Sequence, residues 1–140
     1  MCNNQAGCKS IIYAAQTTTP TVSTGEVIPL GTTFRRTGCK VKQDGNAIAI
    51  CGSGYFKVDV VATLSAPATN ILGVKLQKNG VDVIGAKAEA TPAGVGDLVT
   101  LPISVVVTNS CPESNSILSV VLEGVEPTKV TNMTVVVEKI

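Results

Sequence analysis

The side chains of this 140-residue chain best suited to covalent chemistry are five cysteines, Cys2, Cys8, Cys39, Cys51 and Cys111. The sequence has no histidine, so neither a Cys–His nor a Ser–His catalytic pair can form, and the commonest metal ligand is missing. No cysteines have the C-x-x-C spacing of zinc sites, and no GxxxxGK[ST] or GxGxxG segment could cradle a phosphate. The sequence therefore predicts no enzyme activity, no metal and no cofactor, and it leaves the thiols for cross-linking.

Cys39 and Cys51 are placed symmetrically about Gly45. A three-residue hairpin loop centred on Gly45 would pair Gln43 with Ala47 and set the two cysteines opposite each other. Directly opposed Cβ atoms lie about 4.5–5.5 Å apart, close to the separation that a disulfide requires. This register predicts an intrachain disulfide. The alternative is two free thiols, which a shift of one residue would produce.

The other three cysteines have no partner in this scheme. Cys2 and Cys8 lie on a polar leader, MCNNQAGCKS (residues 1–10), and Cys111 lies in the turn-rich loop NSCPES. An odd number of cysteines is typical of an intermolecular bond or a free thiol. We expect the three to be inter-subunit cross-links or anchors, with the leader acting as a connector. The alternative is a tail whose thiols have no function.

Composition excludes several partners. Lysines and arginines are scattered, and Arg35-Arg36 is the only basic pair, so we expect neither a nucleic-acid footprint nor a membrane-binding patch. No apolar run approaches the ~18 residues of a membrane span. Only 15% of the residues are charged and 44% are apolar, which favours a surface covered by other copies of the chain. The alternative is a small, well-packed monomer.

Short β-branched runs separated by Gly, Pro, Asn, Asp and Ser replace any helical periodicity. Residues 55–64 alternate apolar and polar side chains, as half-buried antiparallel strands do, and Asn79-Gly80 is a strong hairpin signal. We expect an all-β, single-domain antiparallel jelly-roll sandwich of about ten strands over residues 11–140, after an arm at residues 1–10. The expected strands cover residues 10–15, 26–30, 32–36, 40–43, 47–51, 55–64, 71–77, 81–84, 86–91, 98–107, 117–123 and 131–140.

Four segments in order resemble the TNF-like family, which includes the globular head of complement and the terminal domains of spore-surface collagen-like glycoproteins. They are GSGYFKVDVVATL (52–64), VKLQKNGVDVIGA (74–86), SILSVVLEG (116–124) and MTVVVEKI (133–140). The resemblance covers residues 11–140 and implies a ten-strand jelly roll that forms homotrimers, with Tyr55 and small apolar side chains packed towards the three-fold axis. It implies adhesion, receptor engagement or surface display as the role. The chain lacks the collagen stalk and the acidic calcium cluster of some members, so neither is expected here.

The pattern also resembles small proteins of phages and prophages of Gram-positive gut bacteria. We expect a trimeric phage head fibre or decoration protein that attaches to the capsid through residues 1–10. One alternative is a spore-appendage filament or exosporium subunit, although known connectors of that kind often have adjacent cysteines, unlike Cys2 and Cys8. Another is a carbohydrate-binding adhesin, for which Tyr13, Phe34, Tyr55 and Phe56 are the only aromatic rings.

The expected location follows from the first residues and the thiols. Residues 1–20 have no charged region followed by an apolar stretch, so we expect synthesis in the cytosol without a signal peptide. The cytosol keeps thiols reduced. Virions and spores are both released by lysis, after which cysteines on a virion or spore surface would first meet oxidant. The thiols are thus interpreted as latent cross-links.

Overall fold

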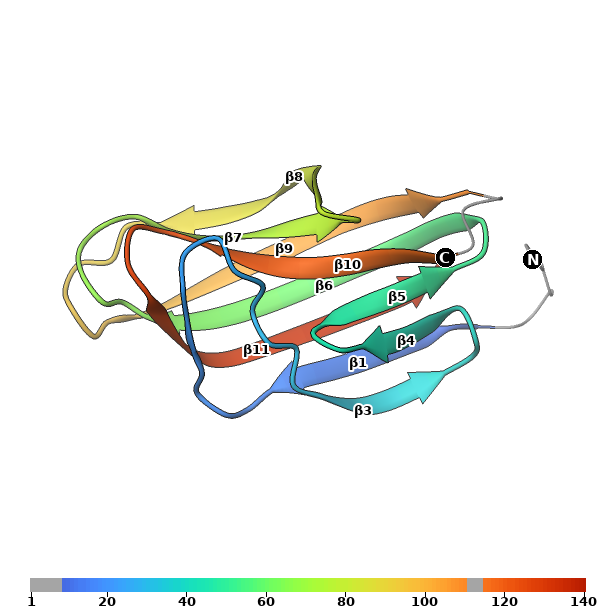
Figure 1. The fold of residues 1–140 in the computed structure, drawn as a ribbon, viewed down its shortest axis with the longest axis horizontal. Coiled ribbons are helices and arrows are strands. Elements are labelled where there is room, and N and C mark those ends of the chain that lie inside the picture. Colours follow the sequence, from blue (N-terminus) through green and yellow to red (C-terminus); the bar gives the residue numbers. More distant parts are fainter. Residues whose placement is uncertain (1–8, 111–114) are drawn as a thin grey trace.

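The computed structural model describes residues 9–110 and 115–140. Within these two ranges the chain forms eleven strands and no helix, which confirms the all-β prediction (Figure 1). The strands are β1 (Ile11–Gln16), β2 (Thr21–Val22), β3 (Thr32–Thr37), β4 (Val41–Asp44), β5 (Ala47–Cys51), β6 (Gly54–Ser65), β7 (Leu72–Lys78), β8 (Val81–Ala90), β9 (Leu98–Asn109), β10 (Asn115–Glu123) and β11 (Thr128–Lys139).

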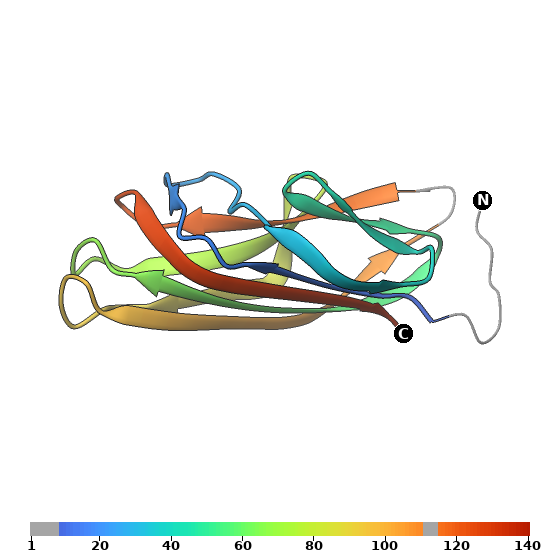
Figure 2. The same ribbon diagram turned by 90° about the horizontal axis from the view of Figure 1, so that it is seen from below.

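The strands make two antiparallel sheets that form an elongated sandwich (Figures 1 and 2). The six-stranded sheet has the order β3-β1-β11-β6-β9, with the short β2 paired to β11, and the five-stranded sheet has the order β4-β5-β10-β7-β8. Strands β8 and β9 lie beside each other at one side of the sandwich, and β3 and β4 lie at the opposite side. The two sides therefore carry different side chains, which matters for self-association.

Strand β6 shows why the core forms where it does. Its period of two points Phe56, Val58, Val60, Ala62 and Leu64 between the sheets, and all five are fully buried. These side chains belong to a core built almost entirely from Val, Ile, Leu and Ala. Burial of such side chains stabilises the fold by about 1.5–3 kcal/mol each. Many buried aliphatic residues can therefore stabilise a core that contains a single buried phenylalanine.

One local prediction is confirmed, and a proline is accommodated at a sheet edge. Asn79 and Gly80 form the two-residue turn between β7 and β8, with φ angles of 53° and 80°. Positive φ at both central residues is the signature of the expected type I′ turn. Pro102, which cannot donate to a neighbouring strand, lies on β9 at the edge of its sheet.

Three expectations need correction. Residues 26–30 form no strand and contribute one isolated bridge, from Val27 to Val121. The expected strands 81–84 and 86–91 are one irregular strand, β8. The hairpin between β4 and β5 pairs Asp44 with Ala47, not Gln43 with Ala47. Gly45 takes a φ of 61°, so the turn needs only Gly45 and one further residue.

Candidate self-association surface

The outer face of the six-stranded sheet exposes an apolar surface. Tyr13, Tyr55, Val61, Val106 and Val136 point away from the core, and Tyr55 is 60% exposed. The register makes Tyr13 and Val136 direct neighbours on β1 and β11, whereas Val106 lies opposite Lys57 and Val136 lies opposite Asp59. Contiguous apolar patches mark interaction sites more often than scattered apolar residues do.

Between these apolar residues the face carries small side chains and few charges. Thr63, Thr100 and Thr134 line it, and the hydroxyls of Thr63 and Thr100 lie 3.3 Å apart. Asp59 accepts a hydrogen bond of 2.7 Å from the Ser104 hydroxyl. Lys57 and Glu138 lie opposite each other on this face, and the Lys57 amine lies 4.0 Å from the Asp59 carboxylate, so the charges of the face have opposite charges as neighbours.

Strand β8 projects an apolar residue from the edge of the other sheet. Lys75 pairs with Lys87 but Gln77 pairs with Asp82, so residues 83–86 bulge opposite a single residue of β7. Gly85 has a φ of 82°, and Ile84 beside it is 99% exposed. The sharp bend of the β8 ribbon in Figure 1 is this bulge, which we call the knob (residues 83–86). Bulges commonly re-aim a side chain and protect a sheet edge from strand pairing.

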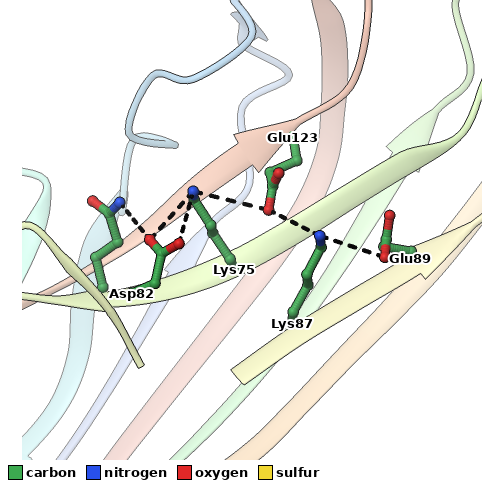
Figure 3. Close-up of polar contacts among 6 residues, drawn as sticks. Lys75, Asp82, Lys87, Glu89 and Glu123 are labelled. Atoms are coloured by element: carbon green, nitrogen blue, oxygen red, sulfur yellow. Dashed lines mark hydrogen bonds and ion pairs between the residues drawn. The ribbon is translucent and has the colours of Figure 1, made fainter. Parts of the chain in front are cut away.

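An ion-pair network fixes the strand on both sides of the knob (Figure 3). The Lys75 amine lies 3.2 Å from the Asp82 carboxylate and 3.9 Å from Glu123. The Lys87 amine lies 3.6 Å from Glu123 and 3.5 Å from Glu89. These contacts connect β7, β8 and β10. Each exposed pair is weak alone, but the network joins the two ends of the bulge to one rigid strand.

The ion pairs of the network make the stability of the fold depend on pH. Hydrogen bonds from Gln77 and Lys75 lower the pKa of Asp82, so the stabilisation from its carboxylate is complete above about pH 4 and is lost as the pH falls through the lowered pKa. Glu123 and Glu89 raise the pKa of Lys87, so its stabilisation is lost only as the pH rises past about 10.5. The chain has no histidine, the side chain that ordinarily titrates between pH 5 and 8. We therefore expect scanning calorimetry to give a constant melting temperature from pH 5 to 7. The Asp82→Asn variant should lose less melting temperature than the native chain between pH 6 and pH 3; an equal loss would contradict this assignment.

A shallow groove runs beside the knob. It has a volume of 370 Å³ and lies between the β8 and β9 edges, with Val81, Val83 and Ile84 on one wall and Val106 and Thr108 on the other. The knob and groove together give the β8–β9 side of the sandwich several exposed apolar side chains, next to Lys78 and Asp82. Contact of these apolar side chains with water is unfavourable, so covering them with another protein surface would lower the free energy.

The outer face of the six-stranded sheet carries a second hollow at its β3 end, across the sheet from the β9 edge. It has a volume of 520 Å³ and is lined by Tyr13, Ala15, Phe34, Arg35 and Thr134, together with Thr17 and Asn132. The rings of Tyr13 and Phe34 lie 6.2 Å apart between centroids and are tilted by 38°. We call this the aromatic pocket. Its rings accept an aliphatic side chain, and Arg35 at its rim would attract an acidic neighbour.

The two described cysteines do not form the predicted disulfide in this structure. Cys39 and Cys51 are free thiols. The Cys51 amide donates to the Lys40 carbonyl at 2.8 Å, so Lys40 and not Cys39 lies opposite Cys51. The one-residue error in the turn therefore removes the opposition on which the disulfide was based. Both thiols nevertheless line the same cavity.

The remaining site predictions have mixed outcomes. Cys2, Cys8 and Cys111 lie outside the described residues, so their cross-linking role stays a prediction, as does the division into an arm and a domain. Of the four aromatic rings considered for sugar binding, Phe56 is buried in the core. In the described ranges no cluster of three acidic or sulfur ligands is placed to hold a metal ion. The same ranges contain no helix long and apolar enough to cross a membrane.

The sequence analysis missed the knob and the aromatic pocket. The signal for the knob was present in VDVIGAK, where Ile84 and Gly85 break the alternation set by Val81 and Val83. An apolar pair followed by glycine inside a strand pattern indicates a bulge. The pocket had no local signal, because it joins residues of β1, β3 and β11 that are far apart in sequence.

Comparison with solved structures identifies the fold. The Eiger TNF from S. frugiperda superposes with a TM-score of 0.74 at 8% identity over 95% of this chain and 92% of that one. The globular domain of zebrafish complement 1qA protein gives a TM-score of 0.68 at 8% identity, covering 94% and 95%. The PRD1 vertex protein P5 gives 0.64 at 12% identity, covering 96% and 99%. Neither a family model nor a curated protein matches the sequence. The chain therefore has the TNF-like jelly-roll fold, as the resemblance implied.

Proposed function

We propose that the chain is a non-enzymatic structural protein that assembles head to tail into a homotrimer. The observation that carries this proposal is the fully exposed Ile84 at one side of the sandwich, with the aromatic pocket at the other. Two different surfaces that fit each other make a heterologous contact, which closes into a ring or continues as a filament. Burial of one isoleucine contributes about 1.5–3 kcal/mol per contact, and a closed ring of three chains makes three such contacts.

The remaining features support a closed ring. The outer face of the six-stranded sheet, with Tyr55, Val61 and Val136, lies between the pocket and the β9 edge. A knob seated in a neighbour's aromatic pocket brings the apolar β8–β9 edge onto this face. Other copies of the chain then cover this apolar surface, as the low content of charged residues predicts. Tyr55 faces the three-fold axis in this arrangement.

For the place of display we propose the surface of a phage particle. The structural likeness to a phage vertex protein supports a role as head fibre or decoration protein, attached to the capsid through residues 1–10. Synthesis in the cytosol and release by lysis accord with the free thiols of Cys39 and Cys51. A filament on a spore surface is the second candidate, favoured by the head-to-tail complementarity, because the same contact polymerises if its rotation does not close.

The test is the native mass of the full-length chain by light scattering, with and without reductant. We expect three chain masses in both conditions. Large polymers that fall to trimers on reduction would assign Cys2 and Cys8 to inter-subunit cross-links and favour the filament. A monomer in both conditions would overturn the proposed assembly.

A further inference from the structure

A cavity of 270 Å³ opens where the ends of β3, β4, β5 and β10 meet, and none of its lining residues belongs to the knob or to the aromatic pocket. Three cations line it, Arg36, Lys40 and Lys42, together with the Asn115 side chain. The two thiols of Cys39 and Cys51 complete its polar lining. No carboxylate lies among the lining residues that belong to the described ranges 9–110 and 115–140, although the chain as a whole has nearly equal numbers of acidic and basic residues.

The fold positions these cations individually. The Arg36 Nε donates a hydrogen bond of 2.7 Å to the Val41 carbonyl, which fixes the guanidinium at the mouth of β4. The Lys40 amide donates to the Ser10 hydroxyl at 3.2 Å, so the backbone beneath its side chain is fixed as well. The Lys40 side chain then runs across Gly52, where an added Cβ would lie 3.0 Å from its amine.

The cations have no counter-charge on the described chain. Lys40 is only 9% exposed, yet no ion pair within residues 9–110 and 115–140 involves Arg36, Lys40 or Lys42. The Arg36 and Lys42 side chains are exposed, and no buried side-chain nitrogen of the described chain lacks a partner, so these charges stay in contact with water and can each donate a charge-assisted hydrogen bond to an anion. Elsewhere on the described surface the chain supplies the opposite charge itself, as Glu123 does for Lys87. Among the described residues, the cavity thus presents positive charge and hydrogen-bond donors, and no carboxylate compensates them.

We propose that this cavity binds a phosphate group. Arginine presents paired donors that match the oxygens of a phosphate, and lysine binds the same group as a point charge. The amide of Asn115 supplies a neutral donor beside them. The phosphate can come from inorganic phosphate or from the phosphodiester backbone of an anionic polymer, since the cavity is open to solvent. The cavity shares no lining residue with the knob or the aromatic pocket, although Arg36 of the cavity follows Arg35 of the pocket on β3.

The thiols make occupancy directly measurable. Cys51 is half-buried in the cavity wall and Cys39 is exposed at its rim, so a bound phosphate blocks the approach of a reagent to Cys51. The experiment follows alkylation of Cys51 by the uncharged reagent iodoacetamide, by peptide mass, in inorganic phosphate and in chloride of equal ionic strength. A parallel titration of the full chain by calorimetry gives the affinity.

We expect phosphate to slow alkylation of Cys51, and Lys42→Gln to weaken the calorimetric affinity about tenfold, the loss of one charge-assisted hydrogen bond. Lys42 is exposed, so this variant folds, whereas Lys40→Gln also removes a buried side chain. Lys129→Gln is the matched control, because it removes the same charge from an exposed position at the far end of β11, and it should bind as the native chain does. Equal alkylation rates in phosphate and chloride, or equal weakening by Lys129→Gln, would overturn the proposal. Tighter binding of poly(glycerol phosphate) than of inorganic phosphate identifies a polymer as the source, and the reverse order identifies the free ion.

Discussion

Replacement of Ile84 by aspartate is expected to convert the assembled protein to monomers. The isoleucine side chain is 99% exposed on the knob, so the substitution disturbs no contact within the chain. In the assembly it would leave a carboxylate inside a neighbour's aromatic pocket, where it would lose its hydration. Loss of one buried isoleucine alone costs about 1.5–3 kcal/mol per contact, a weakening of about tenfold to a hundredfold. Light scattering at matched concentrations measures the change.

The matched control is Val125→Asp. Val125 is also an exposed apolar residue, at 64%, but it lies in the loop between β10 and β11, outside the knob, the groove and the aromatic pocket. It should leave the assembled mass unchanged. An Ile84→Asp protein that assembles as the native chain does would show that the knob is not part of the interface.

A mixing experiment tests the head-to-tail arrangement itself. Phe34→Asp damages the aromatic pocket and leaves the knob intact, the reverse of Ile84→Asp. In a head-to-tail ring, the two defective chains retain one good contact between them. The mixture should therefore form heterodimers and no closed trimers, whereas each variant alone stays monomeric. Heterodimers that fail to form would exclude the pairing of this knob with this pocket.

Much of the fold was predictable because it rests on local signals. The alternation of residues 55–64 follows from the strand's period of two, and the core face it predicts is the one that is buried. The turn at Asn79-Gly80 needed only residues that accept positive φ. Pairing between segments that are far apart in the sequence could not be predicted from local signals. Residues 26–30 have strand composition, but they pair with a neighbour through one bridge only.

The candidate sites depended on features without a local signal. The register from which the Cys39–Cys51 disulfide was predicted is wrong by one residue, because the turn at Gly45 decides the register and the cysteine spacing does not. The cations of the cavity were visible as RRTGCKVK, four basic residues in eight positions without an acid. Their significance was missed, because only the hairpin and the start of β10 bring Lys40, Lys42 and Arg36 around one space. Tertiary packing, and not composition, creates that site.

Adjacent residues of β6 are expected to separate folding from assembly. Phe56 is fully buried and is the largest side chain of the core, so Phe56→Ala should destabilise the folded chain by about 3–5 kcal/mol. Such a loss is a large part of the 5–15 kcal/mol that stabilises a typical domain. Tyr55 points the other way, and Tyr55→Ala should change the unfolding free energy of the separate chain by less than about 0.5 kcal/mol. Urea unfolding of both variants in the Ile84→Asp background measures the chain without its partners.

The same pair behaves differently when the chain can assemble. Binding of native chains to one another stabilises them in proportion to the logarithm of their concentration. Phe56→Ala should lower the urea midpoint at every concentration, since its cavity lies inside one chain. Tyr55→Ala should lower the midpoint only where assembly contributes, because the ring that it removes packs at the proposed three-fold axis. If Tyr55→Ala lowered the midpoint equally in the Ile84→Asp background, the outer face of β6 would serve folding and not association, and the assembly surface would have to be sought elsewhere on the molecule.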